Sequence, residues 1–187
     1  MADRVRLFVG INLDDSWTDG LAAVSDELRQ TIGSGPRWVQ PPLFHVTVVF
    51  LGDQSTKGVE LAGQALRGAA AAASPFLLHL TEVHRLGGHE HGALVAGVAD
   101  RSGGLRQLRV LLDQELRYHR VAFDAKPLVP HITLARPRRR SGPLTPPSYD
   151  LGEAPPLRVG TVTLFQSFLL PTGPKYQSLM KIGLGGR

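Results

Sequence analysis

Two segments of this chain follow the same His-x-Thr pattern among apolar residues, and together they restrict the folds that the chain can adopt. Residues 45–51 read HVTVVFL and residues 131–136 read HITLAR. Alternation of this kind is typical of a β-strand, in which residues i and i+2 share a face about 6.8 Å apart. Each histidine then shares a polar face with a threonine, while the apolar residue between them points into a core. Two such strands predict two half-sites that meet.

Coincidence and a purely structural role are the competing interpretations. With 7 histidines and 10 threonines in 187 residues, roughly 0.37 His-x-Thr pairs arise at random. Two pairs that both carry apolar residues on either side are far rarer. The structural alternative is that both histidines end strands on a solvated face.

Composition fits one globular domain over residues 1–187, with 42% hydrophobic and 20% charged residues. No run of apolar residues is long enough for a transmembrane helix, and the N-terminus lacks the apolar region of a signal peptide. The absence of cysteine excludes disulfides and thiolate chemistry and is consistent with a cytoplasmic protein. Of the 21 basic residues, 17 are arginine, which suits phosphate recognition, although a GC-rich genome produces the same bias.

Periodicity and turn residues predict mixed secondary structure. We expect helices over residues 17–32 and 57–73 and a third helix after Gly104 with leucines at helical spacing. Expected strands cover residues 5–13, 44–51, 76–86, 93–99, 131–136, 157–170 and 176–184, with a short extended piece at 38–39 and a loop over 137–156.

The order strand, helix, motif strand occurs twice, at residues 5–52 and 93–136. We therefore predict an α+β fold of two pseudo-symmetric lobes, each a mainly antiparallel sheet with outer helices, facing across a central cleft. By alternation Phe50 falls on the core face.

Two facing imidazoles have the chemistry of an acid–base pair, since histidine titrates near neutral pH. Thr47, Thr133 and Arg136 would supply donors to a phosphoryl oxygen. Arg136 lies five residues after His131, so it reaches the cleft only through a twist or bulge at the strand end.

Metal catalysis is not expected, because neither motif contains an Asp or Glu. The one ligand-like cluster, His89-Glu90-His91, lies between glycines and is predicted to be an exposed turn. We interpret the other histidines, His79, His84 and His119, as ordinary strand-edge or helix-end residues. Residues 138–140 are three loop arginines, either solvated or in contact with RNA.

On these motifs the sequence resembles the 2H phosphoesterase superfamily, in particular its bacterial and archaeal branch, the RNA 2′,3′-cyclic phosphodiesterases, historically called 2′–5′ RNA ligases. The resemblance runs over nearly the whole chain and is carried by residues 6–11, 38–39, 45–52, 130–136, 164–167 and 173–176. The family often has Glu where this chain has Gln166, which leaves any carboxylate role there unfilled.

The resemblance implies hydrolysis of an RNA or nucleotide 2′,3′-cyclic phosphate to a 2′-phosphomonoester, without metal or other cofactor. We assign His45 as the acid and His131 as the base, with the reverse left open. In the reverse reaction, with the 5′-hydroxyl of an RNA in place of water, the same site would form a 2′–5′ linkage without ATP. Phe8, Trp38 and Tyr176 are candidates for stacking a base. For Phe8 and Trp38 the alternative is core packing, which we favour for Trp38, and Tyr176 would reach the site from the last hairpin.

Three other functions remain open. They are a 2H activity on another cyclic or 2′–5′ phosphodiester, an RNA- or nucleotide-binding module without turnover, and a structural or interaction protein. Expected partners are RNA with 2′,3′-cyclic phosphate ends or a cyclic nucleotide, with no membrane association, and nothing in the sequence requires more than a monomer.

Overall fold

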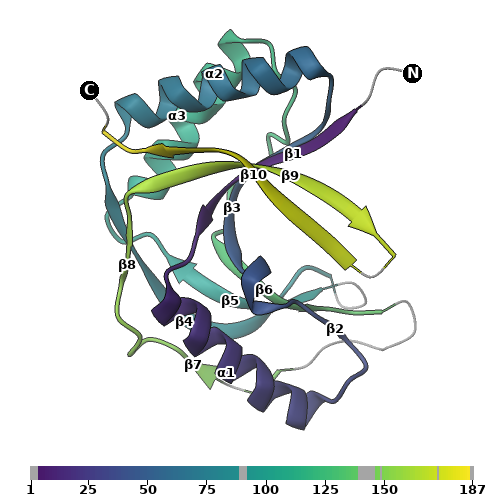
Figure 1. Ribbon diagram of the computed structural model, residues 1–187. Coiled ribbons are helices and arrows are strands. Elements are labelled where there is room, and N and C mark those ends of the chain that lie inside the picture. The colour runs from purple at the N-terminus through teal and green to yellow at the C-terminus, as the bar shows by residue number, and fades with distance from the viewer. Residues whose placement is uncertain (1–3, 89–91, 139–145, 148, 172, 186–187) are drawn as a thin grey trace.

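The computed structural model describes residues 4–88, 92–138, 146–147, 149–171 and 173–185, which form two antiparallel sheets and three α-helices (Figure 1). The elements in chain order are β1 (Val5–Asn12), α1 (Asp15–Ile32), β2 (Arg37–Trp38), the 3₁₀ turn η1 (Pro41–Leu43), β3 (His45–Gln54), α2 (Thr56–Ala72), β4 (Phe76–Leu86), β5 (Ala93–Ala99), α3 (Gly104–Tyr118), β6 (His131–Arg136), β7 (Tyr149–Asp150), β8 (Leu157–Val159), β9 (Thr161–Leu170) and β10 (Gly173–Gly183).

The predicted α+β class is confirmed. One sheet has the strand order β10-β9-β1-β3 and the other has the order β2-β6-β5-β4-β7, with β8 pairing the beginning of β4. Every pairing is antiparallel. In both halves the first strand of the predicted repeat pairs directly with its motif strand, β1 with β3 and β5 with β6.

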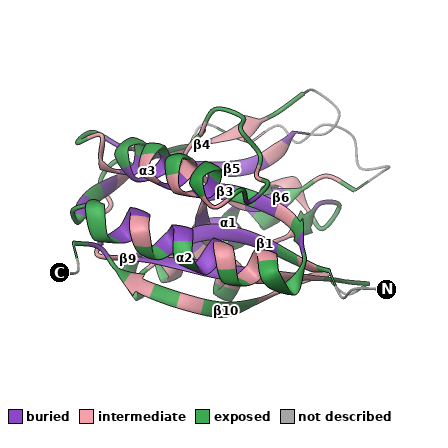
Figure 2. Ribbon diagram, turned by 90° about the horizontal axis from the view of Figure 1, so that it is seen from above, coloured by how far each residue is buried: buried purple, intermediate pink, exposed green. Residues whose placement is uncertain are grey.

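The helices cover the outer faces of the two sheets. In Figure 1, α2 and α3 lie together on the side of β1, β9 and β10, whereas α1 lies on the side of β4 and β7. Viewed from above in Figure 2, buried residues alternate with intermediate and exposed ones along α2, as expected of a helix that buries one face. No helix of the described residues is long and apolar enough to cross a membrane.

Regular apolar spacing explains the helix packing. The buried face of α1 carries Trp17, Leu21, Val24 and Leu28, three or four residues apart. The buried leucines of α3 follow the same rule at positions 105, 108, 112 and 116. Burying one such side chain contributes about 1.5–3 kcal/mol, and the buried apolar residues of both sheets join in one continuous core.

The helix beginnings are capped as their sequences suggest. The carboxylate of Asp14 accepts a hydrogen bond from the backbone N–H of Trp17, and the hydroxyl of Ser55 accepts one from Gly58. As a result the observed helices begin within two residues of the predicted positions.

Several strand predictions are wrong in detail. The strand expected over 176–184 begins earlier, at Gly173, and the loop expected over 137–156 contains β7, which pairs with β4. The strand expected over 157–170 is interrupted at Gly160, because β8 pairs with β4 in one sheet and β9 pairs with β1 in the other. The first motif strand continues past its expected end to Gln54, since Gly52 adopts a left-handed conformation (φ 66°) that lets the strand bend and go on.

A buried arginine connects β3 to the segment that precedes β6. The Arg109 guanidinium of α3 donates to the carbonyl of Val48 in β3 at 3.0 Å and to the carbonyl of Asp124 at 2.9 Å. The N–H of Asp124 in turn donates to the Phe50 carbonyl at 2.8 Å. The segment that precedes β6 is therefore held along the edge of β3.

Candidate active site

The two motif strands have the same pattern of exposure. In β3 and in β6 the histidine and the threonine are half-buried, the residue between them is buried, and two buried residues and one exposed residue follow. A regular strand would alternate after the threonine, so both strands depart from regularity at the same place.

The departure in β3 is a β-bulge. Thr47 and Val49 pair with consecutive residues of β1, which leaves Val48 as an extra residue between them. The next side chain on the cavity face is consequently Phe50. The prediction that Phe50 belongs to the core is wrong, because it is 49% exposed and lines the cavity.

The departure in β6 has the same form. Thr133 and Ala135 pair with consecutive residues of β5, and Leu134 is the extra residue. The bulge brings Arg136 to the cavity face, three residues after the threonine. The bulge that the sequence required for Arg136 is confirmed.

Both histidines, both threonines and Arg136 line one cavity of about 390 Å³ between the two sheets. Its other lining residues come from β1, the β2–η1 segment, β3 and the β9–β10 hairpin. They are Phe8, Arg37, Trp38, Val39, Gln40, Leu43, Phe50, Ser167, Gly173, Pro174 and Tyr176. None of these described residues is acidic.

Backbone carbonyls orient both imidazoles in the same way. Nδ1 of His45 lies 2.7 Å from the carbonyl of Leu43, and Nδ1 of His131 lies 2.7 Å from the carbonyl of Val129. Since a carbonyl only accepts, each Nδ1 carries the proton, and in the neutral ring Nε2 is left as an acceptor. Each histidine is therefore prepared to exchange a proton at Nε2.

The surroundings of the two rings differ. The Thr47 hydroxyl lies 3.0 Å from Nε2 of His45, whereas the described hydrogen bonds include no equivalent contact between His131 and Thr133. Burial lowers the pKa of His45, and the nearby His131 and Arg136 lower it further. Burial likewise lowers the pKa of His131, together with Arg136 and His84. The hydrogen bond to the backbone carbonyl opposes the shift in both rings.

Aromatic rings surround His45. Phe8 stacks on Phe165 with ring centroids 4.9 Å apart, lies 4.9 Å from the His45 ring, and meets the edge of Tyr176 at 5.0 Å. Phe8 is only 2% exposed. This packing contradicts the expectation that Phe8 stacks a base, because its surface is already covered by protein, and it holds the His45 ring instead.

The other two predicted stacking residues also lie at the cavity. Trp38 donates from its indole N–H to the Gly33 carbonyl at 3.1 Å, and the Arg29 guanidinium lies 5.3 Å from its ring centroid, so much of Trp38 packs on the end of α1. Tyr176 meets His45 edge-on at 5.2 Å. Burial raises the pKa of Tyr176, although Arg136 and Arg37 oppose the shift.

A third histidine lies beside His131. Gly97 of β5 pairs with His131, and the space where a side chain of Gly97 would stand is filled by Thr81 and by the His84 ring. Nδ1 of His84 is buried without a hydrogen-bond partner among the described residues. The interpretation of His84 as an ordinary strand-edge residue did not predict that its ring lies beside His131. This proximity depends on which strands pair, which the sequence alone does not show.

Among the described residues, the other histidines that the sequence singles out, His79, His84 and His119, do not line the cavity. His119 lies at the end of α3, as expected of a helix-end residue, with its Nε2 3.7 Å from a carboxylate oxygen of Glu115. Residues 89–91 and 139–140 lie outside the described residues, so the predicted turn and two of the loop arginines stay predictions.

Gln166 does not line the cavity, whereas its neighbour Ser167 does. No group of three or more potential metal ligands occurs among the residues the structure describes.

Curated relatives carry one name. The chain is 30% identical over 189 residues to an RNA 2′,3′-cyclic phosphodiesterase of Thermus thermophilus, with 97% of this chain and 91% of that protein covered. A protein of the same name from Archaeoglobus fulgidus is 27% identical, with coverages of 94% and 98%. A third, from Geobacillus stearothermophilus, is 26% identical over 98% of this chain, which spans 58% of that longer protein.

Solved structures share the fold. The Thermus thermophilus protein TT0787 superposes with a TM-score of 0.82 at 25% identity, covering 97% of this chain and 98% of that one. The structure of E. coli LigT complexed with NADP⁺ gives a TM-score of 0.79 at 22% identity, with coverages of 98% and 100%. A family model described as the 2′-5′ RNA ligase superfamily matches residues 14–164, and the chain belongs to this superfamily.

Proposed function

We propose that this protein hydrolyses RNA or nucleotide 2′,3′-cyclic phosphates to 2′-phosphomonoesters. The observation that carries the proposal is the pair of imidazoles, each fixed by a backbone carbonyl at Nδ1 and both lining one cavity with two threonines and an arginine. The shared name of the relatives, RNA 2′,3′-cyclic phosphodiesterase, supports the same reaction.

The reaction needs one proton removed and one delivered. A base takes a proton from water as the water oxygen bonds to phosphorus, and the bond from phosphorus to the 3′ oxygen breaks as an acid protonates that oxygen. We propose His131 as the base and His45 as the acid. The more open surroundings of His131 support this assignment, because the attacking water must reach the base, while His45 is enclosed by aromatic rings.

The other polar residues would hold the phosphate. We propose that Thr47, Thr133 and Arg136 contact its non-bridging oxygens, whose charge grows in the transition state. A bound phosphate monoanion also raises the pKa of both imidazoles and so counteracts the effect of burial, which helps one ring to hold its proton. The absence of carboxylates from the described lining residues supports a reaction without metal or other cofactor.

Phe50 would receive the base. It is the one phenylalanine of the described cavity lining that is largely exposed, and exposed rings are the surfaces on which nucleic-acid bases stack. Tyr176 and the edge of Trp38 would complete this wall.

The wider predictions belong to the same proposal. The protein would act as one bilobal domain over residues 1–187, as a monomer in the cytoplasm, on RNA ends or cyclic nucleotides. The reverse reaction, 2′–5′ ligation, would use the same groups with a 5′-hydroxyl in place of water. The alternatives are action on another cyclic or 2′–5′ phosphodiester and binding without turnover.

The test is product identification. Purified protein is incubated in EDTA with a short RNA that ends in a 2′,3′-cyclic phosphate, alongside the His45→Ala and His131→Ala variants. We expect wild type to form a 2′-phosphate and both variants to lose about 10²–10⁴ in rate. An inactive but folded wild type would contradict the proposal, and activity only after addition of metal would contradict the metal-free mechanism.

A further inference from the structure

Two arginines face each other at the cavity. In the β2–β6 ladder Arg37 pairs directly with Arg136, and the next ladder bond runs from the Val39 N–H to the Leu134 carbonyl at 2.8 Å. Directly paired residues have Cα atoms about 4.5–5.5 Å apart and project to the same face of a sheet. Arg37 therefore extends on the face to which the bulge brings Arg136, and both line the cavity.

This arrangement is unfavourable unless an anion is bound. Like charges directly opposite each other in a sheet destabilise it. Neither guanidinium is in an ion pair among the described residues, and none of the described lining residues is acidic. Both side chains are exposed, so each is accessible to a ligand. Paired guanidinium groups without carboxylates are the arrangement that proteins use for phosphate.

The two arginines serve different parts of the cavity. Arg136 affects the pKa of both histidines, so it lies near the place of the reacting phosphate. Arg37 stands one strand farther out, on β2, and together with Arg136 it opposes the rise in the pKa of Tyr176. The positive charge of the cavity thus continues from Arg136 on β6 to Arg37 on β2, the strand at the edge of this sheet.

We propose that Arg37, together with Arg136, binds a second phosphate, the one on the 5′ oxygen of the nucleotide that carries the cyclic end. This inference rests on the proposed function. A 2′,3′-cyclic phosphate terminates the strand, so the neighbouring phosphate of the substrate can only be on the 5′ side. That phosphate is either the internal diester of an RNA strand or a terminal 5′-phosphate.

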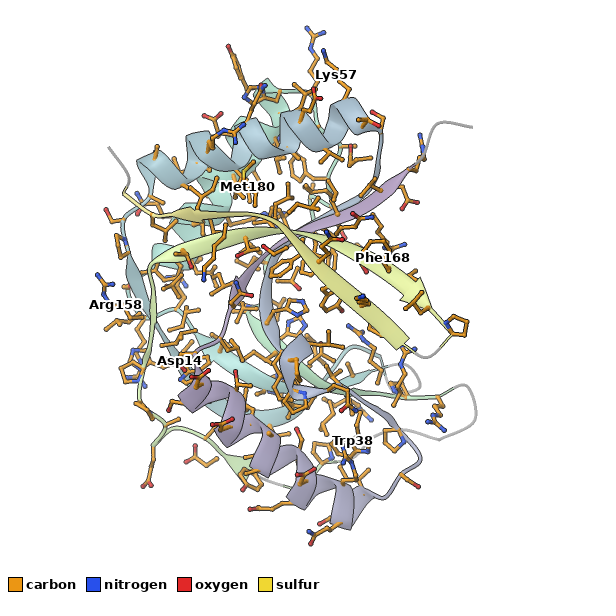
Figure 3. All side chains as sticks on the ribbon, viewed as in Figure 1. Asp14, Trp38, Lys57, Arg158, Phe168 and Met180 are labelled. Atoms are coloured by element: carbon orange, nitrogen blue, oxygen red, sulfur yellow. The ribbon has the colours of Figure 1, made fainter. Side chains whose placement is uncertain are left out.

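The test uses a minimal pair of substrates. Adenosine 2′,3′-cyclic phosphate is compared with its 5′-phosphorylated form, and the dinucleotide ApA with a 2′,3′-cyclic end distinguishes an internal diester from a terminal phosphate. We expect the kcat/KM of wild type to be about tenfold higher for the 5′-phosphorylated nucleotide than for the unphosphorylated one. In Arg37→Gln the two kcat/KM values should be equal. Arg158→Gln is the matched control, because Arg158 is an exposed arginine of β8 at the opposite side of the molecule from Trp38 (Figure 3). That control should preserve the ratio.

A binding measurement separates this inference from the proposed function. Adenosine 2′-phosphate and adenosine 2′,5′-bisphosphate are titrated into the protein at several salt concentrations, which requires no turnover. We expect the bisphosphate to bind more tightly, with a steeper salt dependence that Arg37→Gln reduces by about 0.7 in log–log slope. Equal affinity of wild type for both ligands, or an equal loss of both in Arg37→Gln, would overturn the second site even if hydrolysis is observed. A salt-dependent preference that Arg37→Gln abolishes would support it even if hydrolysis is not.

Discussion

The two motif strands share a backbone and differ in what surrounds it. Both carry His-x-Thr, both have a bulge directly after the threonine, and both hold the imidazole through a carbonyl two residues before the histidine. The β3 half is aromatic, with Phe50 at the third position after its threonine. The β6 half is basic, with Arg136 at the corresponding position.

The difference suits a proposed separation of roles, in which the same backbone arrangement occurs twice but the β3 half contacts the base and the β6 half contacts the phosphate. A symmetric backbone delivers two equivalent imidazoles to one cavity, which suits a reaction that needs one proton removed and one supplied. The reaction itself is asymmetric, because a nucleotide has an apolar base on one side and a charged phosphate on the other. The side chains at the two equivalent positions match that asymmetry.

The largest expected effect separates the two histidines. Each alanine variant should lose about 10²–10⁴ in rate on the normal substrate. A substrate in which sulfur replaces the 3′ leaving oxygen needs no proton at that atom, since a thiolate is a good leaving group. We therefore expect His45→Ala, the variant without the acid, to recover most of its activity on the thio substrate and His131→Ala to recover none. Rescue of His131→Ala instead would reverse the assignment.

The smallest expected effect concerns stability. Burial lowers the pKa of both histidines in the folded chain below the ordinary value of 6.5. Between the lowered and the ordinary value the unfolded chain binds more protons, so the free energy of unfolding falls as pH drops through this window and stays level above it. Urea unfolding at pH 7.5 and 5.0 should show a smaller pH difference in His45→Gln than in wild type. His131→Gln should reduce the difference less, since His131 lies in the more open half. An unchanged difference in His45→Gln would show that this ring is not buried as described.

The sequence predicted much of this site because its signal is local. The two His-x-Thr segments and the three helices depend on neighbours in the chain, and the sequence places them within a few residues of their observed positions. The bulges depend on pairing with another strand, so alternation placed Phe50 in the core although its counterpart Arg136 was expected to need a bulge. The signal available in the sequence was the pair of consecutive apolar residues after each threonine, Val48-Val49 and Leu134-Ala135.

Arg37 and His84 were missed for a related reason. Strand β2 has only two residues, too few for periodicity to place Arg37 opposite Arg136. The position of His84 beside His131 depends on Gly97, whose missing side chain leaves room for the ring. Both depend on contacts between strands far apart in the sequence.

The most direct test of the division between the halves is one kinetic comparison. kcat/KM is measured for Phe50→Ala and Arg136→Gln on adenosine 2′,3′-cyclic phosphate and on methyl ribofuranoside 2′,3′-cyclic phosphate, which has no base. We predict that Phe50→Ala loses about tenfold on the nucleotide and little on the base-free sugar, because stacking of one base is worth about 1–3 kcal/mol. For Arg136→Gln we predict that kcat/KM falls by an equal factor on the nucleotide and on the base-free sugar. Equal losses for Phe50→Ala on both substrates, or a loss for Arg136→Gln that depends on the base, would contradict the account.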